Sequence, residues 1–105
     1  MRWPNVLLDG DRWLVADFEL ASRNGTALPE TCRASGAFAP EARAGEPCTF
    51  ASDVWQVGNL VLEWRKAKSM ALDAQAISFT EVLMTGTGNR PSCQDALALP
   101  WLHRA

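Results

Sequence analysis

Two short apolar runs near the start of the chain predict a β-hairpin. Residues 6–8 and 13–16 are apolar, and the sequence between them, 9–11, is Asp-Gly-Asp, which is typical of a turn. A tight connection of this kind would set Leu8 opposite Trp13 on the facing strand. The segment is therefore expected to be a short antiparallel hairpin.

Residues 22–47 follow neither the period of a helix nor that of a strand. The segment is rich in glycine, alanine, proline, arginine and glutamate, and this composition predicts a long irregular loop with one helical turn after Pro40. Loops of this length are uncommon in a compact domain unless they are functional or disordered. The segment is accordingly a candidate for function.

The clearest helix is predicted over residues 52–65. Ser52 suits the N-cap and Asp53 favours the first turn, where an acidic residue complements the helix dipole. Apolar residues then recur at helical spacing and widen into a broad surface: Val54, Trp55, Val57, Leu60, Val61, Leu62 and Trp64. A helix with so wide an apolar surface is expected to be central and buried.

Two further helices are predicted near the end of the chain. The first spans residues 73–84 and is broken by the glycine-rich sequence 85–89. The second spans residues 92–99, with Ser92 as its N-cap and an acidic residue three positions later. The fold class is therefore mainly α, with a short antiparallel β-hairpin, a long loop and about three to four helices.

Length and charge narrow the functional classes. The chain has 105 residues, enough for one domain with a modest core, and its net charge of −2 offers no basic field for nucleic acid. No apolar run approaches the length that spans a bilayer, and the opening residues lack the apolar stretch of a signal peptide. We expect a cytoplasmic protein that binds neither nucleic acid nor membranes.

Several short sequences follow one another along the chain in a recognisable order. They are Asn5-Val6-Leu7-Leu8, then Asp17-Phe18-Glu19, Ala39-Pro40-Glu41, Ser52-Asp53-Val54-Trp55-Gln56-Val57-Gly58, Arg90-Pro91-Ser92, and Leu99-Pro100-Trp101-Leu102. In this order and at these spacings they resemble the C-terminal lobe of the eukaryotic protein kinases. The resemblance covers nearly the whole chain, residues 1–105, and implies an α+β kinase-like C-lobe fragment. In it, 5–17 would be a metal-site hairpin, 18–47 an activation-type segment, 52–65 the central helix and 92–99 the last helix.

Asn5 and Asp17 are the candidate metal and cofactor-binding residues. Phosphoryl transfer needs a divalent cation on the nucleotide phosphates, and magnesium prefers oxygen ligands such as amides and carboxylates. The hairpin register would bring Asn5 and Asp17 within about 8 Å of each other, so that one ion could bridge them. The alternative is that both residues merely cap the ends of the hairpin, as Asn and Asp often do.

The resemblance implies an ATP-dependent protein kinase of the Ser/Thr type, with ATP and Mg²⁺ as cofactors and a protein as substrate. Arg2 and Asn5 match the lysine and asparagine of the kinase catalytic loop, whose aspartate would come directly before Met1. No N-terminal lobe, with its glycine-rich loop and lysine, occurs in these residues. We therefore expect the 105 residues to be inactive by themselves, with no catalytic residue among them.

Three residues are implied to be structural. Glu41 and Arg90 match the buried ion pair that ties the activation segment to the lobe, and Asp53 matches the residue that braces the catalytic-loop backbone from the central helix. The alternatives are a surface ion pair without consequence and simple capping by Asp53. Because the catalytic loop and the other lobe are missing, we also expect exposed apolar surface and self-association.

Departures from the kinase pattern support a second function. Glu19 replaces the glycine that normally follows Asp-Phe, and a glycine permits backbone angles that a side chain penalises. Residues 33–37, Arg-Ala-Ser-Gly-Ala, stand where kinases have Gly-Thr-x-x-Tyr, so two substrate-placing hydroxyls are absent. The alternative is a pseudokinase-type module that binds a partner protein without catalysis.

Overall fold

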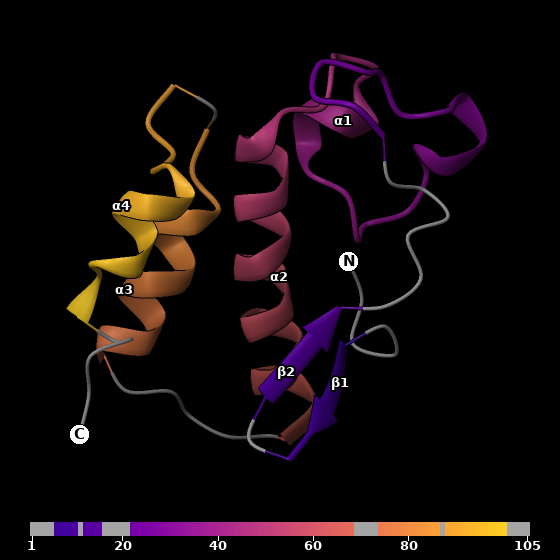
Figure 1. Ribbon diagram of the computed structural model, residues 1–105. Coiled ribbons are helices and arrows are strands. Elements are labelled where there is room, and N and C mark those ends of the chain that lie inside the picture. The colour runs from indigo at the N-terminus through magenta and orange to yellow at the C-terminus, as the bar shows by residue number, and fades with distance from the viewer. Residues whose placement is uncertain (1–5, 11, 16–21, 69–73, 87, 101–105) are drawn as a thin grey trace.

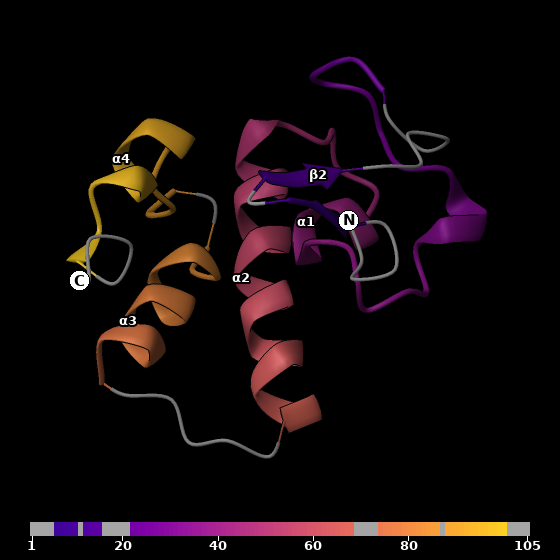
Figure 2. The same ribbon diagram turned by 60° about the horizontal axis from the view of Figure 1, so that its bottom comes forward.

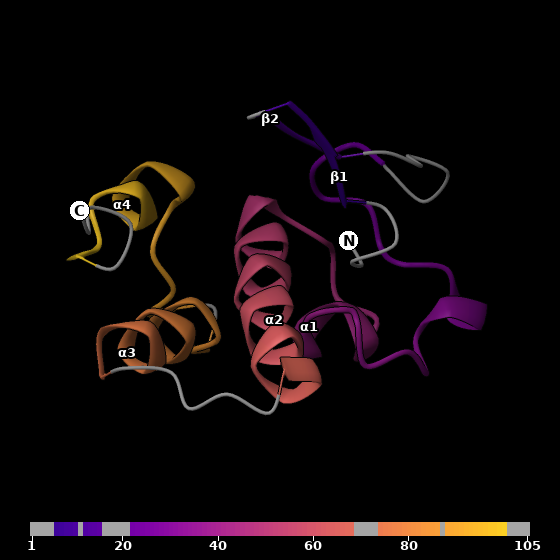
Figure 3. The same ribbon diagram turned by 90° about the horizontal axis from the view of Figure 1, so that it is seen from below.

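The chain folds around one central helix. In the computed structural model, which describes residues 6–10, 12–15, 22–68, 74–86 and 88–100, α2 (Phe50–Lys68) lies between two groups of elements (Figure 1). On one side are α3 (Ala74–Leu83) and α4 (Cys93–Leu97), and on the other are α1 (Pro40–Arg43) and the loop before it. The view from below shows the same order of α3, α2 and α1 (Figure 3). The described part of the chain is thus mainly helical.

Two strands pair at the start of the chain. β1 (Val6–Asp9) is antiparallel to β2 (Arg12–Val15), with Leu8 opposite Trp13 and Val6 opposite Val15. Gly10 lies in the connection with a φ of 63°, a left-handed conformation that glycine adopts without steric cost. In the turned view β2 crosses in front of α2 (Figure 2), but the view from below shows both strands set apart from that helix (Figure 3).

The long loop over 22–47 is closed by backbone hydrogen bonds at its two ends. The Gly25 amide donates to the Cys48 carbonyl at 2.6 Å, and the Cys48 amide donates to the Thr26 carbonyl at 2.9 Å. Within the loop the structure contains a 3₁₀ turn, Glu30–Cys32, which the sequence did not predict. The closed ends hold the loop to the start of α2.

The helical turn predicted after Pro40 is confirmed as α1. Pro40 opens it at a position where the missing amide proton costs nothing. Its last helical residue is Arg43. Gly45, two residues later, has a φ of 87°, and its amide bonds the Ala42 carbonyl while the Glu46 amide bonds the Glu41 carbonyl. This pair of bonds is a Schellman motif, which satisfies the last carbonyls of the helix and fixes its direction.

The central helix is longer than predicted at both ends. It runs from Phe50 to Lys68, whereas the sequence predicted 52–65 with Ser52 as N-cap. Ser52 instead lies in the first turn, where its hydroxyl accepts a hydrogen bond from the Thr49 amide at 3.2 Å. This is the returning half of a capping box, and it moves the start of the helix towards Phe50.

The last two helices are close to their predicted positions. α3 spans Ala74–Leu83 instead of 73–84, and residue 73 lies outside the described part. Ser92 is confirmed as the N-cap of α4, because its hydroxyl accepts from the Asp95 amide at 3.0 Å. That helix ends at Leu97 and not at residue 99, since the Ala98 and Leu99 amides already form tighter turns with the carbonyls three residues before.

The hydrophobic core lies between α2 and α3. Val54, Phe79 and Leu83 are its buried members, and partly buried Val61, Ala96 and Leu99 pack against them. Leu83 is only 1% exposed. Burial of this cluster holds α3 and α4 on the same side of α2.

Gly58 of α2 lies against the end of α3. A Cβ atom added there would lie 2.8 Å from Met84 Cγ and 3.0 Å from Leu83 Cβ. Gly58→Val is therefore expected to destabilise the fold by about 1–3 kcal/mol through overpacking, even though valine has the better helix propensity. The measurement is urea unfolding, with Gly86→Ala as control because nothing lies within 4 Å of a Cβ at Gly86. Equal stability of Gly58→Val and the wild type would contradict this contact.

Within the described ranges, no helix has both the length and the apolar character that crossing a membrane requires.

Candidate functional site

Glu41 and Arg90, 49 residues apart in the sequence, meet in the structure as an ion pair. Arg90 Nη1 donates to Glu41 Oε2 at 2.8 Å, and Arg90 Nη2 donates to Glu41 Oε1 at 3.1 Å. The two parallel bonds form the bidentate arrangement that is specific to guanidinium and carboxylate. The Arg90 side chain is 2% exposed and that of Glu41 is 9% exposed, so the pair is shielded from water.

Arg90 also holds two backbone carbonyls that the sequence did not reveal. Its Nη1 donates to the Ala51 carbonyl at 2.7 Å, and its Nε donates to the Thr85 carbonyl at 3.0 Å. One guanidinium therefore connects α1, the first turn of α2 and the segment after α3. A buried arginine needs such partners, because an unpaired donor in this place would keep its full desolvation penalty.

Ser52 completes the set of contacts around the pair. Its hydroxyl donates to Glu41 Oε2 at 3.0 Å while it accepts from the Thr49 amide. The sequence predicted Ser52 as an N-cap and gave no sign of this contact with Glu41. The one feature of the sequence that could have indicated a further role for Ser52 is its position next to Asp53, in the motif at the start of the central helix. We call Glu41, Ser52 and Arg90 the buried ionic cluster.

The cluster lowers the pKa of Glu41. Desolvation by burial raises the pKa of this carboxyl, but the hydrogen bonds from Arg90 and Ser52, a backbone hydrogen bond and the charge of Arg90 outweigh it. The folded state therefore favours the ionised form of Glu41 more strongly than the unfolded chain does.

Acid should accordingly destabilise the fold through Glu41. A carboxyl whose folded pKa is depressed contributes its stabilisation above its ordinary value, 4.5, and loses it as the pH falls through that value and below. We expect the free energy of unfolding to fall between pH 6 and about pH 3, measured by urea unfolding. Glu41→Gln should flatten this dependence, and an unchanged slope in the variant would assign the acid sensitivity to other groups.

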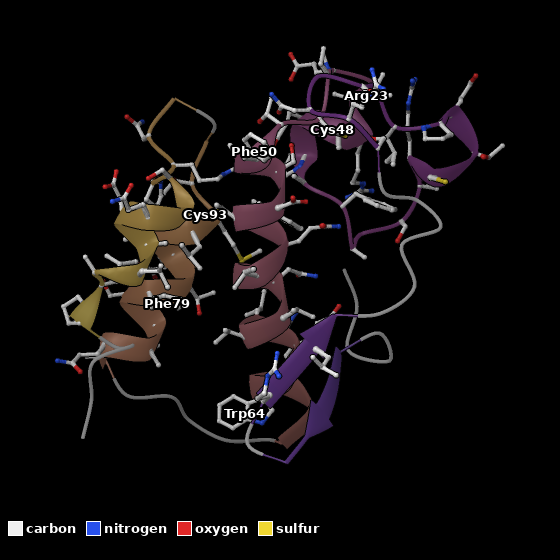
Figure 4. All side chains as sticks on the ribbon, in the orientation of Figure 1. Arg23, Cys48, Phe50, Trp64, Phe79 and Cys93 are labelled. Carbon is white, nitrogen blue, oxygen red and sulfur yellow. The ribbon has the colours of Figure 1, made fainter. Side chains whose placement is uncertain are left out.

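A second contact joins α2 to the loop. Gln56 Nε2 donates to the Ala37 carbonyl at 3.1 Å, and Gln56 is buried at 7% exposed. Together with the ionic cluster, this bond holds the segment before α1 against the N-terminal half of α2 (Figure 4).

Asp53 faces outward from the same turn of α2. As a residue it is exposed, and its carboxylate forms no hydrogen bond with a described residue. Desolvation nevertheless raises the pKa of Asp53 above its ordinary value. The backbone that Asp53 is predicted to brace belongs to the first residues of the chain, which lie outside the described part, so that role stays a prediction.

The candidate metal ligands Asn5 and Asp17 also lie outside the described residues, as does Glu19. Among described residues, no group of three or more His, Cys, Asp and Glu side chains comes together in a way that could hold a metal ion. The structure thus assembles the predicted structural residues Glu41 and Arg90, while the predicted metal site remains a sequence-based expectation.

Comparisons with known proteins add no family to this picture. No family model, curated protein or solved structure matches the chain.

Proposed function

We propose that these 105 residues are part of the C-terminal lobe of a protein kinase-like domain that transfers the γ-phosphoryl group of ATP to a protein hydroxyl. The observation that carries the proposal is the Glu41–Arg90 pair. It joins the residue after Ala39-Pro40 to the residue before Pro91, as the kinase-like motifs imply, and it does so at 2.8 Å between side chains that are nearly buried.

The exposed face of α2 supports the same proposal. Phe50, Asp53 and Val57 follow each other at spacings of three and four residues, so they share one face of the helix. Phe50 is 69% exposed and Val57 is 37% exposed. Exposed apolar side chains next to Asp53, whose pKa is raised, are typical of a surface that further protein covers. In the kinase resemblance, the catalytic loop would cover this surface.

In the proposed enzyme, Asn5 and Asp17 would hold Mg²⁺, which neutralises charge on the phosphates of ATP during transfer. Oxygen from an amide and a carboxylate is the ligand chemistry that this ion prefers. The buried ionic cluster would keep the activation-type segment in a fixed position relative to α2. The base that accepts the proton of the substrate hydroxyl would be the aspartate of the catalytic loop, in a residue before Met1.

The proposal is tested by a phosphate-transfer assay on a longer protein that includes the residues encoded before Met1. We expect the coding sequence before Met1 to supply that aspartate and an N-terminal lobe with a glycine-rich loop and a lysine. A protein that includes them should transfer labelled phosphate from ATP in the presence of Mg²⁺, and Asp17→Asn should abolish the transfer. The 105 residues alone should transfer none. An upstream sequence without these features would contradict the proposal.

A pseudokinase-type interaction module is the second candidate. It is favoured by Ala34 and Ala37, which lack the hydroxyl groups expected of a substrate-binding segment. The same longer chain separates the two functions, because a pseudokinase would fold and bind a partner protein but transfer no phosphate.

A further inference from the structure

Arg33 is anchored at one point and turned towards the end of α1. Its Nε donates to the Leu28 carbonyl at 3.0 Å. Its guanidinium lies against Gly45, where an added Cβ would be 2.9 Å from Nη1 and 3.1 Å from Cζ. Only a glycine allows the arginine to approach the backbone so closely, so the group is held in place while its Nη atoms are left for other partners.

Arg43 is anchored in the same way and at the same end of α1. Its Nε donates to the Arg33 carbonyl at 3.2 Å, and the side chain is exposed. The Arg33 guanidinium lies against Gly45 in the Schellman motif that ends α1, and Arg43 is the last residue of that helix. Each arginine thus uses its Nε to hold the loop and keeps its two Nη groups as a fork.

Neither fork is neutralised within the described chain. No described carboxylate forms an ion pair with Arg33 or Arg43, and the Nη atoms of both lack a hydrogen-bond acceptor among the described residues. Glu30 and Glu46, the acidic neighbours in sequence, are both exposed, and Glu41 is engaged by Arg90. Two arginine side chains that are each fixed through Nε to the same loop therefore have no anionic partner among the described residues.

We propose that Arg33 and Arg43 form a binding site for a phosphate group. Two forked guanidinium groups match the planar edges and the double negative charge of a phosphate monoester better than the single charge of a carboxylate. Anchoring through Nε reduces the entropy that binding would otherwise cost. The site does not depend on the proposed function, because neither arginine belongs to the residues that carry the kinase-like resemblance.

The test is a titration of the isotopically labelled 105-residue chain with inorganic phosphate, followed by NMR. We expect saturable shifts centred on the amides of Arg33, Arg43 and Gly45 that sodium chloride of the same ionic strength does not produce. Arg33→Gln and Arg43→Gln should each weaken binding about tenfold, which is 1.4 kcal/mol. Arg12→Gln, which removes the same charge from an exposed position on β2, should leave it unchanged.

A parallel titration with phosphoserine identifies the source of the group. Binding at least as tight as that of inorganic phosphate indicates a phosphorylated side chain, and binding of inorganic phosphate alone indicates the free ion. If Arg33→Gln does not fold, the phosphate titration is repeated with Arg33→Lys, and the loss of binding in Arg43→Gln, at an exposed position, still tests the site. Shifts that chloride reproduces, that Arg12→Gln reduces equally, or that centre on other residues would overturn the proposal.

Discussion

Replacing Arg90 with glutamine should lower the free energy of unfolding by about 3–5 kcal/mol, the usual effect of removing one partner of a buried ion pair. The variant leaves the Glu41 carboxylate, 9% exposed, without its counter-charge, and it removes donors from the Ala51 and Thr85 carbonyls. Because domains of this size are stable by only about 5–15 kcal/mol, the variant should approach the unfolding limit at room temperature. Urea unfolding followed by circular dichroism measures the loss.

Two control variants test whether the loss in Arg90→Gln comes from breaking the buried ion pair. Arg12→Gln, an exposed arginine on β2, should change stability by no more than about 0.5 kcal/mol. The double variant Glu41→Leu, Arg90→Met should lose clearly less than the sum of its two single variants, because it leaves no unpaired charge. Strict additivity of the single losses would contradict a coupled pair.

Truncating Leu83 to alanine should cost about 2–5 kcal/mol, because the change removes buried methyl groups and leaves a cavity. Leu83 is 1% exposed and packs with Val54 and Phe79 where α3 meets α2. The backbone of Gly58 already lies so close to Leu83 that an added Cβ would be 3.0 Å from Leu83 Cβ. The end of α3 therefore has little room to move towards α2 and fill the cavity. Thermal and urea unfolding both measure this loss.

Leu97→Ala is the matched control for the core. Leu97 lies on α4 and is 65% exposed, so the same truncation should cost no more than about 0.5 kcal/mol. A loss at Leu97 as large as that at Leu83 would show that the exposed residue is covered, for example by a second copy of the chain. Equal and small losses at both positions would contradict the α2–α3 core.

Local patterns sufficed for much of the helical fold. The apolar spacing after Ser52 predicted the central helix, Ser92 predicted the start of α4, and Pro40 predicted the turn that became α1. These features depend on residues within one or two turns of each other, so their physical causes are contained in short stretches of sequence. The loop was predicted as irregular, but its closure was not, because that closure depends on hydrogen bonds between Gly25, Thr26 and the distant Cys48. The 3₁₀ turn is formed by local bonds and was also not predicted.

The sequence by itself determined that this chain is mainly helical, with a central apolar helix, and it predicted an ion pair between Glu41 and Arg90. Only the tertiary structure decided how that pair is satisfied. Ser52 turned from a predicted N-cap into a donor to Glu41, and Arg90 acquired two carbonyls from separate segments. The physical reason is that burial removes water as a partner, so polar groups must find one another across the fold, and no local pattern records which ones do.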